Sequence, residues 1–210
     1  MTKTMNNTTE LVFILDRSGS MSGLEGDTVG GFNSMIAKQR GEEGVCYVST
    51  VLFNAESEVI HDRVKLQDVP KLTEKEYFPH GCTALLDAVG EAVKHIANIH
   101  KYARSEDVPA HTLFCITTDG MENASKKWTH RKVKELIEKQ KEKYGWEFLF
   151  MGADIDSAQV AESIGISEER SASFTHNGRG SSSVFEAVGC VMEECRSSSP
   201  ISGKWKSKLK

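Results

Sequence analysis

Short apolar runs alternate with amphipathic stretches along most of the chain, and this alternation limits the fold more than any other feature. Strands that alternate with helices predict a mostly parallel sheet covered by helices on both faces, an α/β fold. Only a few turn residues separate the runs 44–54 and 57–66, so these two form a hairpin, and the more polar second run lies antiparallel at the sheet edge. The predicted strands are 10–16, 44–54, 57–66, 111–120, 146–154 and 171–175, and the predicted helices are 23–39, 84–103, 128–145, 157–164 and 181–196.

The chain has 210 residues, and we expect residues 1–196 to form a single domain, because no repeat or clear linker interrupts the pattern. The remaining segment, 197–210, has little to bury and is predicted to be a basic, disordered tail. The last ten residues contain four lysines and no acid, so residues 1–200 carry a net charge of −4 − 4 = −8. An acidic body argues against general nucleic-acid binding, which needs a basic face.

The five cysteines are odd in number and include no C-x-x-C pair, which argues against both a disulfide framework and a zinc site. The first residues lack the charged-then-apolar pattern of a secretory signal. No apolar run approaches the roughly 20 residues that are needed to cross a bilayer. We therefore expect a cytoplasmic protein that does not insert into a membrane.

Polar side chains follow two of the predicted strands where each strand ends. Asp16 ends the first strand, and the alternate positions of Ser18 and Ser20 let both hydroxyls turn to the same side. Asp119 ends a second strand, and Thr83 lies where a loop enters a helix on the same face. In open α/β sheets, ligands bind outside the carboxyl ends of the strands, where the strand order reverses. Two carboxylates and three hydroxyls select a hard cation; Mg²⁺ fits best, with Mn²⁺ or Ca²⁺ as alternatives.

Each of these segments alone has a simpler structural explanation. Ser20 or Ser22 could cap the helix that follows, and Thr83 could cap the next helix. Asp119 and Gly120 form a pair that is common in turns after strands. It is the joint occurrence of the three segments, in this order on an alternating α/β pattern, that favours a metal site.

The segments DRSGSMSG, GCTALLDA and ITTDGMEN resemble the three loops of the metal-ion-dependent adhesion site of von Willebrand factor type A domains. That pattern is Asp-x-Ser-x-Ser, a later Thr and a later Asp, and every position matches. The resemblance extends over roughly residues 9–196, and the chain is similar to stand-alone intracellular bacterial members of the family. It implies a doubly wound, mostly parallel sheet of six strands with one antiparallel edge strand. His80 and Cys82 flank the threonine loop where the family often has small residues.

The resemblance also implies a role for each site residue. Ser18, Ser20 and Thr83 would bind the ion directly, whereas Asp16 and Asp119 would act directly or through water. The last coordination position would be left for a carboxylate that a partner protein supplies. The sequence therefore predicts a Mg²⁺-dependent protein-binding module that captures an Asp or Glu of its partner and is not an enzyme.

Two other classes of protein compete with this interpretation. One is a metal-dependent phosphatase or other hydrolase that uses the same acidic cleft. A phosphotransferase with Asp16 as nucleophile would need a second acid at the position of Ser18, and the sequence has no Gly-x-x-x-x-Gly-Lys-Ser/Thr loop. The segment GSMSG carries Met21 where a serine hydrolase needs its nucleophile. The other class is a structural interaction protein that keeps the fold and does not need the metal.

Three further segments have both a functional and an ordinary explanation. Asp154 and Asp156 could hold a second cation, but a turn with Asp156 as helix N-cap is the simpler interpretation. The glycine-containing run HNGRGSSS, residues 176–183, could bind an anion, although a plain turn and cap explains it as well. The lysines around Trp205 could contact an acidic partner or a membrane surface, and a solvated tail is the alternative.

Overall fold

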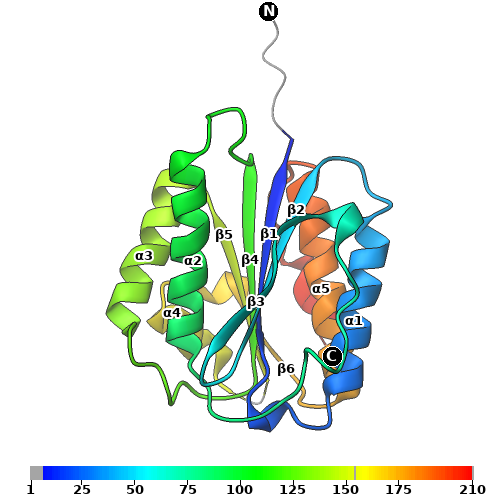
Figure 1. Ribbon diagram of the computed structural model, residues 1–210, viewed down its shortest axis with the longest axis vertical. Helices are drawn as coiled ribbons and strands as arrows, with labels where there is room; N and C mark the ends of the chain where they lie inside the picture. The colour runs from blue at the N-terminus through cyan, green and yellow to red at the C-terminus, as the bar shows by residue number, and fades with distance from the viewer. Residues whose placement is uncertain (1–6, 154, 210) are drawn as a thin grey trace, which may run out of the picture.

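The computed structural model describes residues 7–153 and 155–209. One sheet of six strands runs through the molecule in the order β3-β2-β1-β4-β5-β6 (Figure 1). All neighbouring strands are parallel except β3, which runs antiparallel to β2 at one edge. This confirms the predicted fold class, including the antiparallel edge strand. The strands are β1 (Thr9–Asp16), β2 (Cys46–Phe53), β3 (Ser57–Lys65), β4 (His111–Thr118), β5 (Glu147–Ala153) and β6 (Ser171–Phe174).

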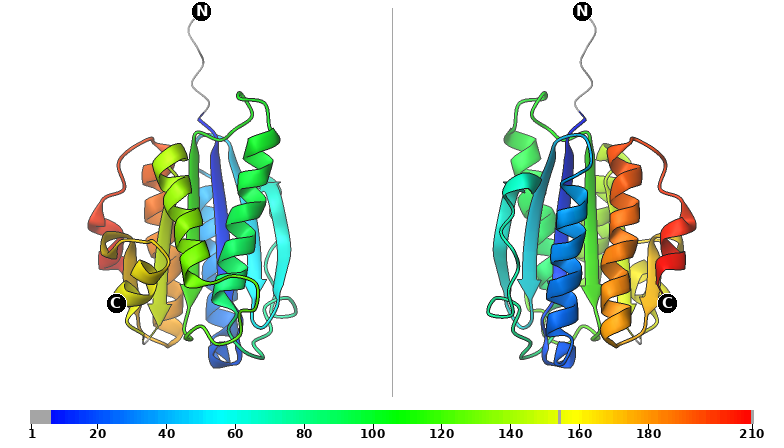
Figure 2. Two further views of the ribbon diagram at one scale, coloured as in Figure 1. Left: turned by 90° about the vertical axis from the view of Figure 1, so that its left-hand side faces the viewer. Right: turned by 90° about the vertical axis from the view of Figure 1, so that its right-hand side faces the viewer.

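Helices cover both faces of the sheet. One face carries α1 and α5, and the opposite face carries α2, α3 and α4 (Figures 1 and 2). Strand β1 supplies apolar side chains to both sides, because its run is continuously apolar and alternate residues point to opposite faces. Leu11 and Phe13 belong to one core cluster and Val12 to the other. The helices are α1 (Glu25–Gln39), α2 (Leu85–Tyr102), α3 (His130–Tyr144), α4 (Ser157–Ser163) and α5 (Gly178–Arg196).

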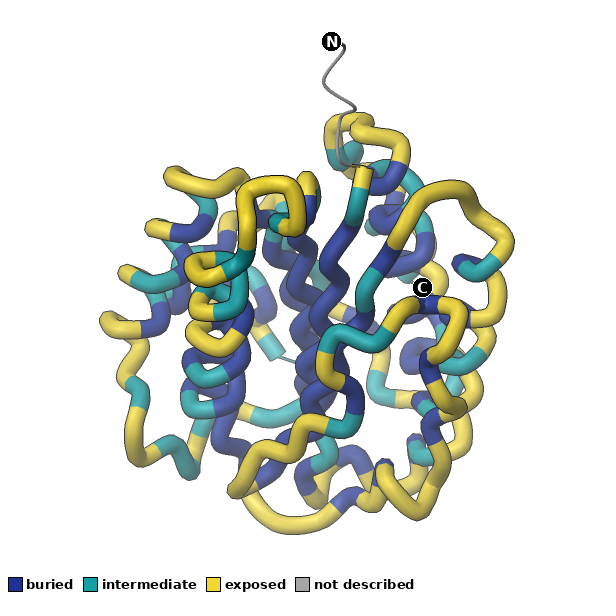
Figure 3. The backbone as a smooth tube through the Cα atoms, turned by 45° about the horizontal axis from the view of Figure 1, so that its top comes forward, coloured by how far each residue is buried: buried dark blue, intermediate teal, exposed yellow. Residues whose placement is uncertain are grey.

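The strand order reverses between β1 and β4. From β1 the chain proceeds to β2 on one side, whereas β4 leads to β5 and β6 on the other side. The carboxyl ends of β1 and β4 therefore lie side by side where the connections diverge, at the lower edge of the sheet in Figure 1. Figure 3 shows that the central strands are buried along their length, while the connecting turns are exposed. The fold thus places the ends of the two aspartate-bearing strands beside each other.

Helix boundaries agree with the sequence prediction within a few residues. Helix α3 ends at Gly145, which adopts the left-handed conformation with φ of 66°. Helix α5 begins at Gly178, three residues before the predicted start, because the Asn177 side chain accepts a hydrogen bond from the Gly180 amide and caps the helix there.

The predicted disordered tail is wrong for the segment that follows α5. Residues Gly203–Lys208 form a 3₁₀ helix (η4) that packs against α5, and the side chain of Trp205 is 0% exposed within the core cluster on the α1 and α5 face of the sheet. Glu194 of α5 also accepts a 2.9 Å hydrogen bond from the Ser202 amide. The segment therefore belongs to the same folded unit. The prediction followed from the polar composition of the segment. It failed because a single large apolar side chain, that of Trp205, is enough to anchor a short segment.

Among the helices in the described part of the chain, none combines the length and the apolar character that a membrane span requires.

Candidate metal centre

Three loops meet at the carboxyl ends of β1 and β4, and hydrogen bonds join them. The Gly19 amide of the β1–α1 loop donates to the Gly81 carbonyl of the loop before α2 at 3.0 Å. Thr83, in that second loop, is paired with Asn123 of the β4–α3 loop. The Thr83 amide donates to Asn123 Oδ1 at 2.9 Å, and the Asn123 amide donates to the Thr83 carbonyl at 3.0 Å. The three predicted segments therefore form one structural unit.

Asp16 is fully buried at the end of β1, and both of its carboxylate oxygens accept hydrogen bonds. Oδ1 accepts from the Ser18 amide at 2.7 Å, and Oδ2 accepts from the Thr118 hydroxyl at 2.5 Å. Burial raises the pKa of Asp16 to about 6 and outweighs these hydrogen bonds, while the nearby negative charge of Asp119 raises it further. The carboxylate is thus held in one orientation in a poorly solvated position.

Ser18, Ser20 and Asp119 form a chain of oxygen atoms next to Asp16. The Ser18 and Ser20 hydroxyl oxygens lie 3.1 Å apart, and the Ser20 hydroxyl donates to Asp119 Oδ1 at 2.6 Å. The other oxygen, Asp119 Oδ2, is buried and lies 2.9 Å from His176 Nε2, but the hydrogen bond of that nitrogen goes to the Ser20 carbonyl, so Oδ2 accepts no hydrogen bond from the described residues. Only 2% of the Asp119 side chain is exposed. A buried carboxylate oxygen without a donor is unfavourable unless a cation or another group satisfies it.

Thr83 approaches the same point from the loop before α2. A Cβ atom at Gly120 would lie 2.8 Å from the Thr83 hydroxyl oxygen, so the turn after Asp119 can pass this closely only because residue 120 is glycine. The side chain of Thr83 is buried. The structure therefore brings together all five predicted residues, which are Asp16, Ser18, Ser20, Thr83 and Asp119.

The helix-capping explanation of these residues is wrong. The N-cap of α1 is Leu24 and the N-cap of α2 is Ala84, and neither makes a side-chain capping hydrogen bond. Ser22 donates its hydroxyl to the Gly19 carbonyl within its own turn. The hydroxyls of Ser20 and Thr83 are therefore not required to begin a helix.

Positive charge is scarce around the two aspartates. Arg17 follows Asp16 in the sequence, but its guanidinium pairs with Glu58 at 2.7 Å and not with either aspartate. In residues 7–153 and 155–209, neither Asp16 nor Asp119 forms an ion pair with a lysine or arginine. The described residues also contain no cluster of three or more His, Cys, Asp or Glu side chains suited to a metal. Any cation here would depend on hydroxyl oxygens for part of its coordination.

Two residues of this site were not identified from the sequence. Thr118 bonds to Asp16 and directly precedes Asp119, so its position in the third segment was an available signal. His176 lies in the loop between β6 and α5, and its Nε2 atom is 2.9 Å from Asp119 Oδ2 and 3.1 Å from the Ser20 carbonyl oxygen. Nothing in the local sequence around His176 links it to the segments that contain Ser20 and Asp119.

The other polar segments have ordinary structural roles. Asp156 caps α4 by accepting a hydrogen bond from the Gln159 amide at 3.1 Å, whereas Asp154 lies outside the described residues. The run 176–183 begins α5, with Asn177 as its cap. Cys82 is exposed beside Thr83.

The sequence matches no protein-family model and no curated protein. In structure it is similar to a von Willebrand factor type A protein from Catenulispora acidiphila, with a TM-score of 0.60 and 12% identity over 89% of this chain and 42% of that one. The manganese-loaded TRAP protein of Plasmodium vivax has a TM-score of 0.55 and 17% identity, over 82% of this chain and 70% of that one.

Proximal thread matrix protein 1 from the mussel byssus, in a structure with zinc in its metal-ion-dependent adhesion site motif, has a TM-score of 0.56 and 16% identity over 87% of this chain and 45% of that one. This chain spans less than half the length of the mussel and Catenulispora proteins. Likeness at such low identity shows the fold alone. The chain has the fold of von Willebrand factor type A domains.

Proposed function

We propose that this chain is a Mg²⁺-dependent protein-binding module, in which a metal ion at the carboxyl ends of β1 and β4 captures an Asp or Glu of a partner protein. The observation that carries the proposal is Asp119 Oδ2, a buried carboxylate oxygen that accepts no hydrogen bond from the described residues; His176 Nε2 lies 2.9 Å away, but no lysine or arginine is paired with it. A bound divalent cation would satisfy this oxygen and offset the charges of both aspartates.

The residues at the site fit a hard cation. Ser18, Ser20 and Thr83 would supply neutral oxygens, and Asp16 and Asp119 would supply the charge or orient bound water. Mg²⁺ is the first choice, with Mn²⁺ or Ca²⁺ possible, and the manganese and zinc in two similar structures support a divalent ion. Once bound, the ion would act as a Lewis acid that attracts an external carboxylate.

The surroundings of the site suit a protein partner. Phe78 and Met121 lie on two of the loops that meet at the site, and 63% and 71% of their surfaces are exposed. Large exposed apolar side chains beside a polar centre are typical of protein interfaces. The acidic body argues against nucleic acid. A cytoplasmic location is part of the proposal, because all five cysteines are free.

Catalysis is disfavoured by the geometry of Asp16. Both of its oxygens accept hydrogen bonds, from the Ser18 amide and the Thr118 hydroxyl, so neither is presented to a substrate as a nucleophile. We therefore propose that the module binds and does not hydrolyse. Incubation with a generic phosphate ester and Mg²⁺ or Mn²⁺ checks this, and turnover that Ser18→Ala abolishes would establish the phosphatase alternative.

The binding function is tested with a displayed library of random peptides. Selection is carried out in Mg²⁺ and in EDTA, and enriched peptides are resynthesised with Asp→Asn or Glu→Gln at each acidic position. We expect enrichment in Mg²⁺ alone and loss of binding when one particular carboxylate is removed. Peptides that bind equally in EDTA, or that tolerate removal of every acid, would contradict the proposal.

A further inference from the structure

His176 connects the start of α5 to the two loops that carry Ser20 and Asp119. Its Nε2 atom lies 3.1 Å from the Ser20 carbonyl oxygen and 2.9 Å from Asp119 Oδ2. The imidazole is partly buried, with 31% of the side chain exposed. Three segments that are distant in the sequence therefore meet at one nitrogen atom.

The chemistry of the two neighbours decides what this nitrogen can do. A backbone carbonyl and a carboxylate are both acceptors, so Nε2 must carry a hydrogen and cannot present a lone pair to a metal. Nε2–H makes its hydrogen bond with the Ser20 carbonyl, and Asp119 Oδ2 lies beside the same donor. His176 is therefore a hydrogen-bond donor at the edge of the site and not an additional metal ligand.

A polar atom lies close to each oxygen of the Asp119 carboxylate. The Ser20 hydroxyl donates to Oδ1 at 2.6 Å, and His176 Nε2 lies 2.9 Å from Oδ2 while its hydrogen bond goes to the Ser20 carbonyl. Since the two oxygens belong to one planar group, the hydrogen bond at Oδ1 and the imidazole packed against Oδ2 together limit the rotation of the carboxylate. Groups that orient a ligand in this way strongly affect the affinity of a metal site.

The backbone around His176 is fixed by close packing. The next residue, Asn177, caps α5 by accepting a 2.8 Å hydrogen bond from the Gly180 amide. A Cβ atom at Gly178 would collide with the Asp27 carboxylate of α1, and one at Gly180 would collide with the Thr175 carbonyl. The imidazole is thus carried by an ordered helix start, which is needed if it is to position another side chain.

We infer that His176 is a positioning residue of the candidate metal centre: its Nε2–H group, bonded to the Ser20 carbonyl, lies against Asp119 Oδ2, limits the orientation of that carboxylate and ties the start of α5 to the loops that would hold the ion. This inference rests on the proposed metal site. It predicts that metal affinity depends on a hydrogen-bond donor at position 176, although this residue does not touch the ion.

The test compares Mg²⁺ affinity, measured by titration calorimetry at one fixed pH, for the wild-type chain, His176→Leu and His176→Gln. Leucine keeps bulk without a donor, whereas the glutamine amide places an N–H close to the position of Nε2. We expect His176→Leu to bind Mg²⁺ about 10–100-fold more weakly, and His176→Gln to recover most of that loss. The matched control is His130→Leu at the exposed start of α3, which should bind like the wild type.

Thermal unfolding in EDTA first establishes that the variants are folded. If the wild type binds Mg²⁺ and His176→Leu binds it equally well, the inference about His176 is overturned while the metal site stands. Equal weakening in His176→Leu and His176→Gln would overturn the assigned donor role. No Mg²⁺ binding by the wild type would overturn both proposals. As a second readout, Mg²⁺ should slow amide hydrogen exchange in the first turn of α5 in the wild type and not in His176→Leu.

Discussion

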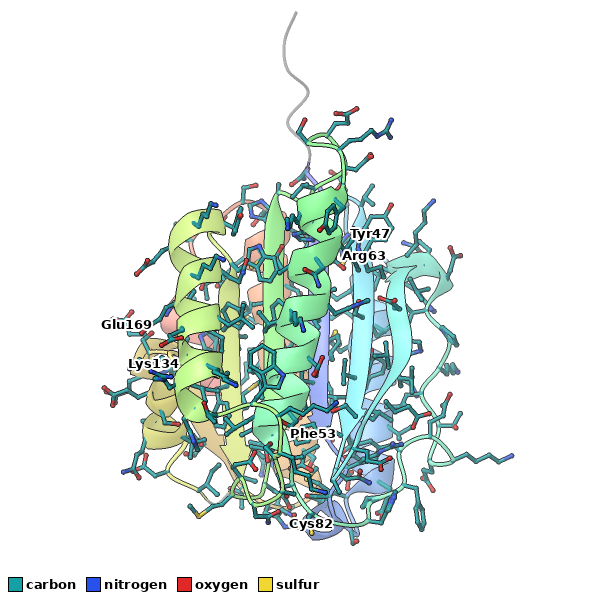
Figure 4. All side chains as sticks on the ribbon, turned by 60° about the vertical axis from the view of Figure 1, so that its left-hand side comes forward. Tyr47, Phe53, Arg63, Cys82, Lys134 and Glu169 are labelled. Atoms are coloured by element: carbon teal, nitrogen blue, oxygen red, sulfur yellow. The ribbon has the colours of Figure 1, made fainter. Side chains whose placement is uncertain are left out.

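Buried carboxylates lie at both ends of the sheet, but the protein neutralises them differently. At the amino end of β1, Glu10 is 0% exposed, and its Oε2 atom accepts from Arg63 Nε at 2.8 Å and lies 3.3 Å from His100 Nε2. At the carboxyl end, Asp16 and Asp119 have hydroxyl and amide donors, but no lysine or arginine pairs with them in the described chain. Figure 4 shows the two ends, with Arg63 and Tyr47 near one and Cys82 near the other.

At the amino end, an irregular stretch of β3 brings Arg63 to the buried charge of Glu10. The pairing of β2 with β3 shifts register near Thr50, and Arg63 has a φ of 50°, which is uncommon for a residue with a side chain. This conformation lets Arg63 reach Glu10 and lie over the Tyr47 ring at 5.1 Å. The protein thus provides its own cation at this end. Within the residues the structure describes, Asp16 and Asp119 have no arginine or lysine comparable to Arg63, although His176 lies 2.9 Å from Asp119 Oδ2. On the proposed function, an external ion supplies the positive charge there.

The largest expected effect tests the amino end. Arg63→Met removes the main cation beside a carboxylate that is fully buried, and breaking a buried pair on one side costs about 3–5 kcal/mol. We expect a loss near the lower value, because His100 stays in place. Chemical denaturation in EDTA measures it. Glu10→Gln combined with Arg63→Met should recover part of the lost stability. If Mg²⁺ stabilises Arg63→Met as much as it stabilises the wild type, the two ends of the sheet are independent. A loss of stability below about 1 kcal/mol would contradict the idea that Arg63 neutralises Glu10 at the amino end.

The next effect concerns pH and the carboxyl end. The pKa of Asp16 is about 6 in the folded protein and 3.8 when unperturbed. Between these two pH values the folded protein keeps a proton on Asp16, whereas the unfolded chain has released it. Stability of the metal-free protein must therefore fall as pH rises from about 4 to about 6, by about 3 kcal/mol for a shift of this size. Denaturation in EDTA across this range measures the slope. Asp16→Asn should flatten it, and an equal slope in the variant would assign the effect to other groups.

Mg²⁺ itself should have a slightly smaller effect. An ion that binds only the folded protein raises stability by about 2.7 kcal/mol at a hundredfold excess over its dissociation constant. Asp119→Asn relieves the repulsion between the two aspartates, so the metal-free variant should be at least as stable as the wild type. It should nevertheless lose most of the response, because a formal charge beside the ion is gone. Thermal unfolding of both proteins in Mg²⁺ and in EDTA decides this, and equal shifts would remove Asp119 from the site.

Where the signal was local, the sequence predicted the fold and the meeting of the five candidate site residues. The strand that ends at Asp16 is a continuous apolar run, and the Asp-x-Ser-x-Ser pattern follows within a few residues, so both could be read directly. Contacts between distant segments left no such signal. His176 meets Asp119 only after β6 and α5 are in place, and Arg63 reaches Glu10 only through an irregular strand. Burial of Trp205 was missed because its neighbours are polar.

The smallest expected effect tests whether Arg17 belongs to the site at all. Arg17 is next to Asp16 in the sequence, but its guanidinium pairs with Glu58 at 2.7 Å and donates to the Glu76 carbonyl at 3.0 Å. Glu58 is more than half exposed, with 57% of its side chain in contact with solvent, whereas only 12% of the Arg17 side chain is exposed, so solvent screens this ion pair mainly from the glutamate side.

We expect Arg17→Gln to change stability by no more than about 1 kcal/mol, the usual value for exposed ion pairs. Its Mg²⁺ affinity should match that of the wild type, because the removed charge faces Glu58 and not the aspartates. Calorimetric titration of both proteins at low and at moderate salt measures this. A clear gain in Mg²⁺ affinity would mean that Arg17 competes with the ion, and the carboxyl end would then contain an internal cation, as the amino end does.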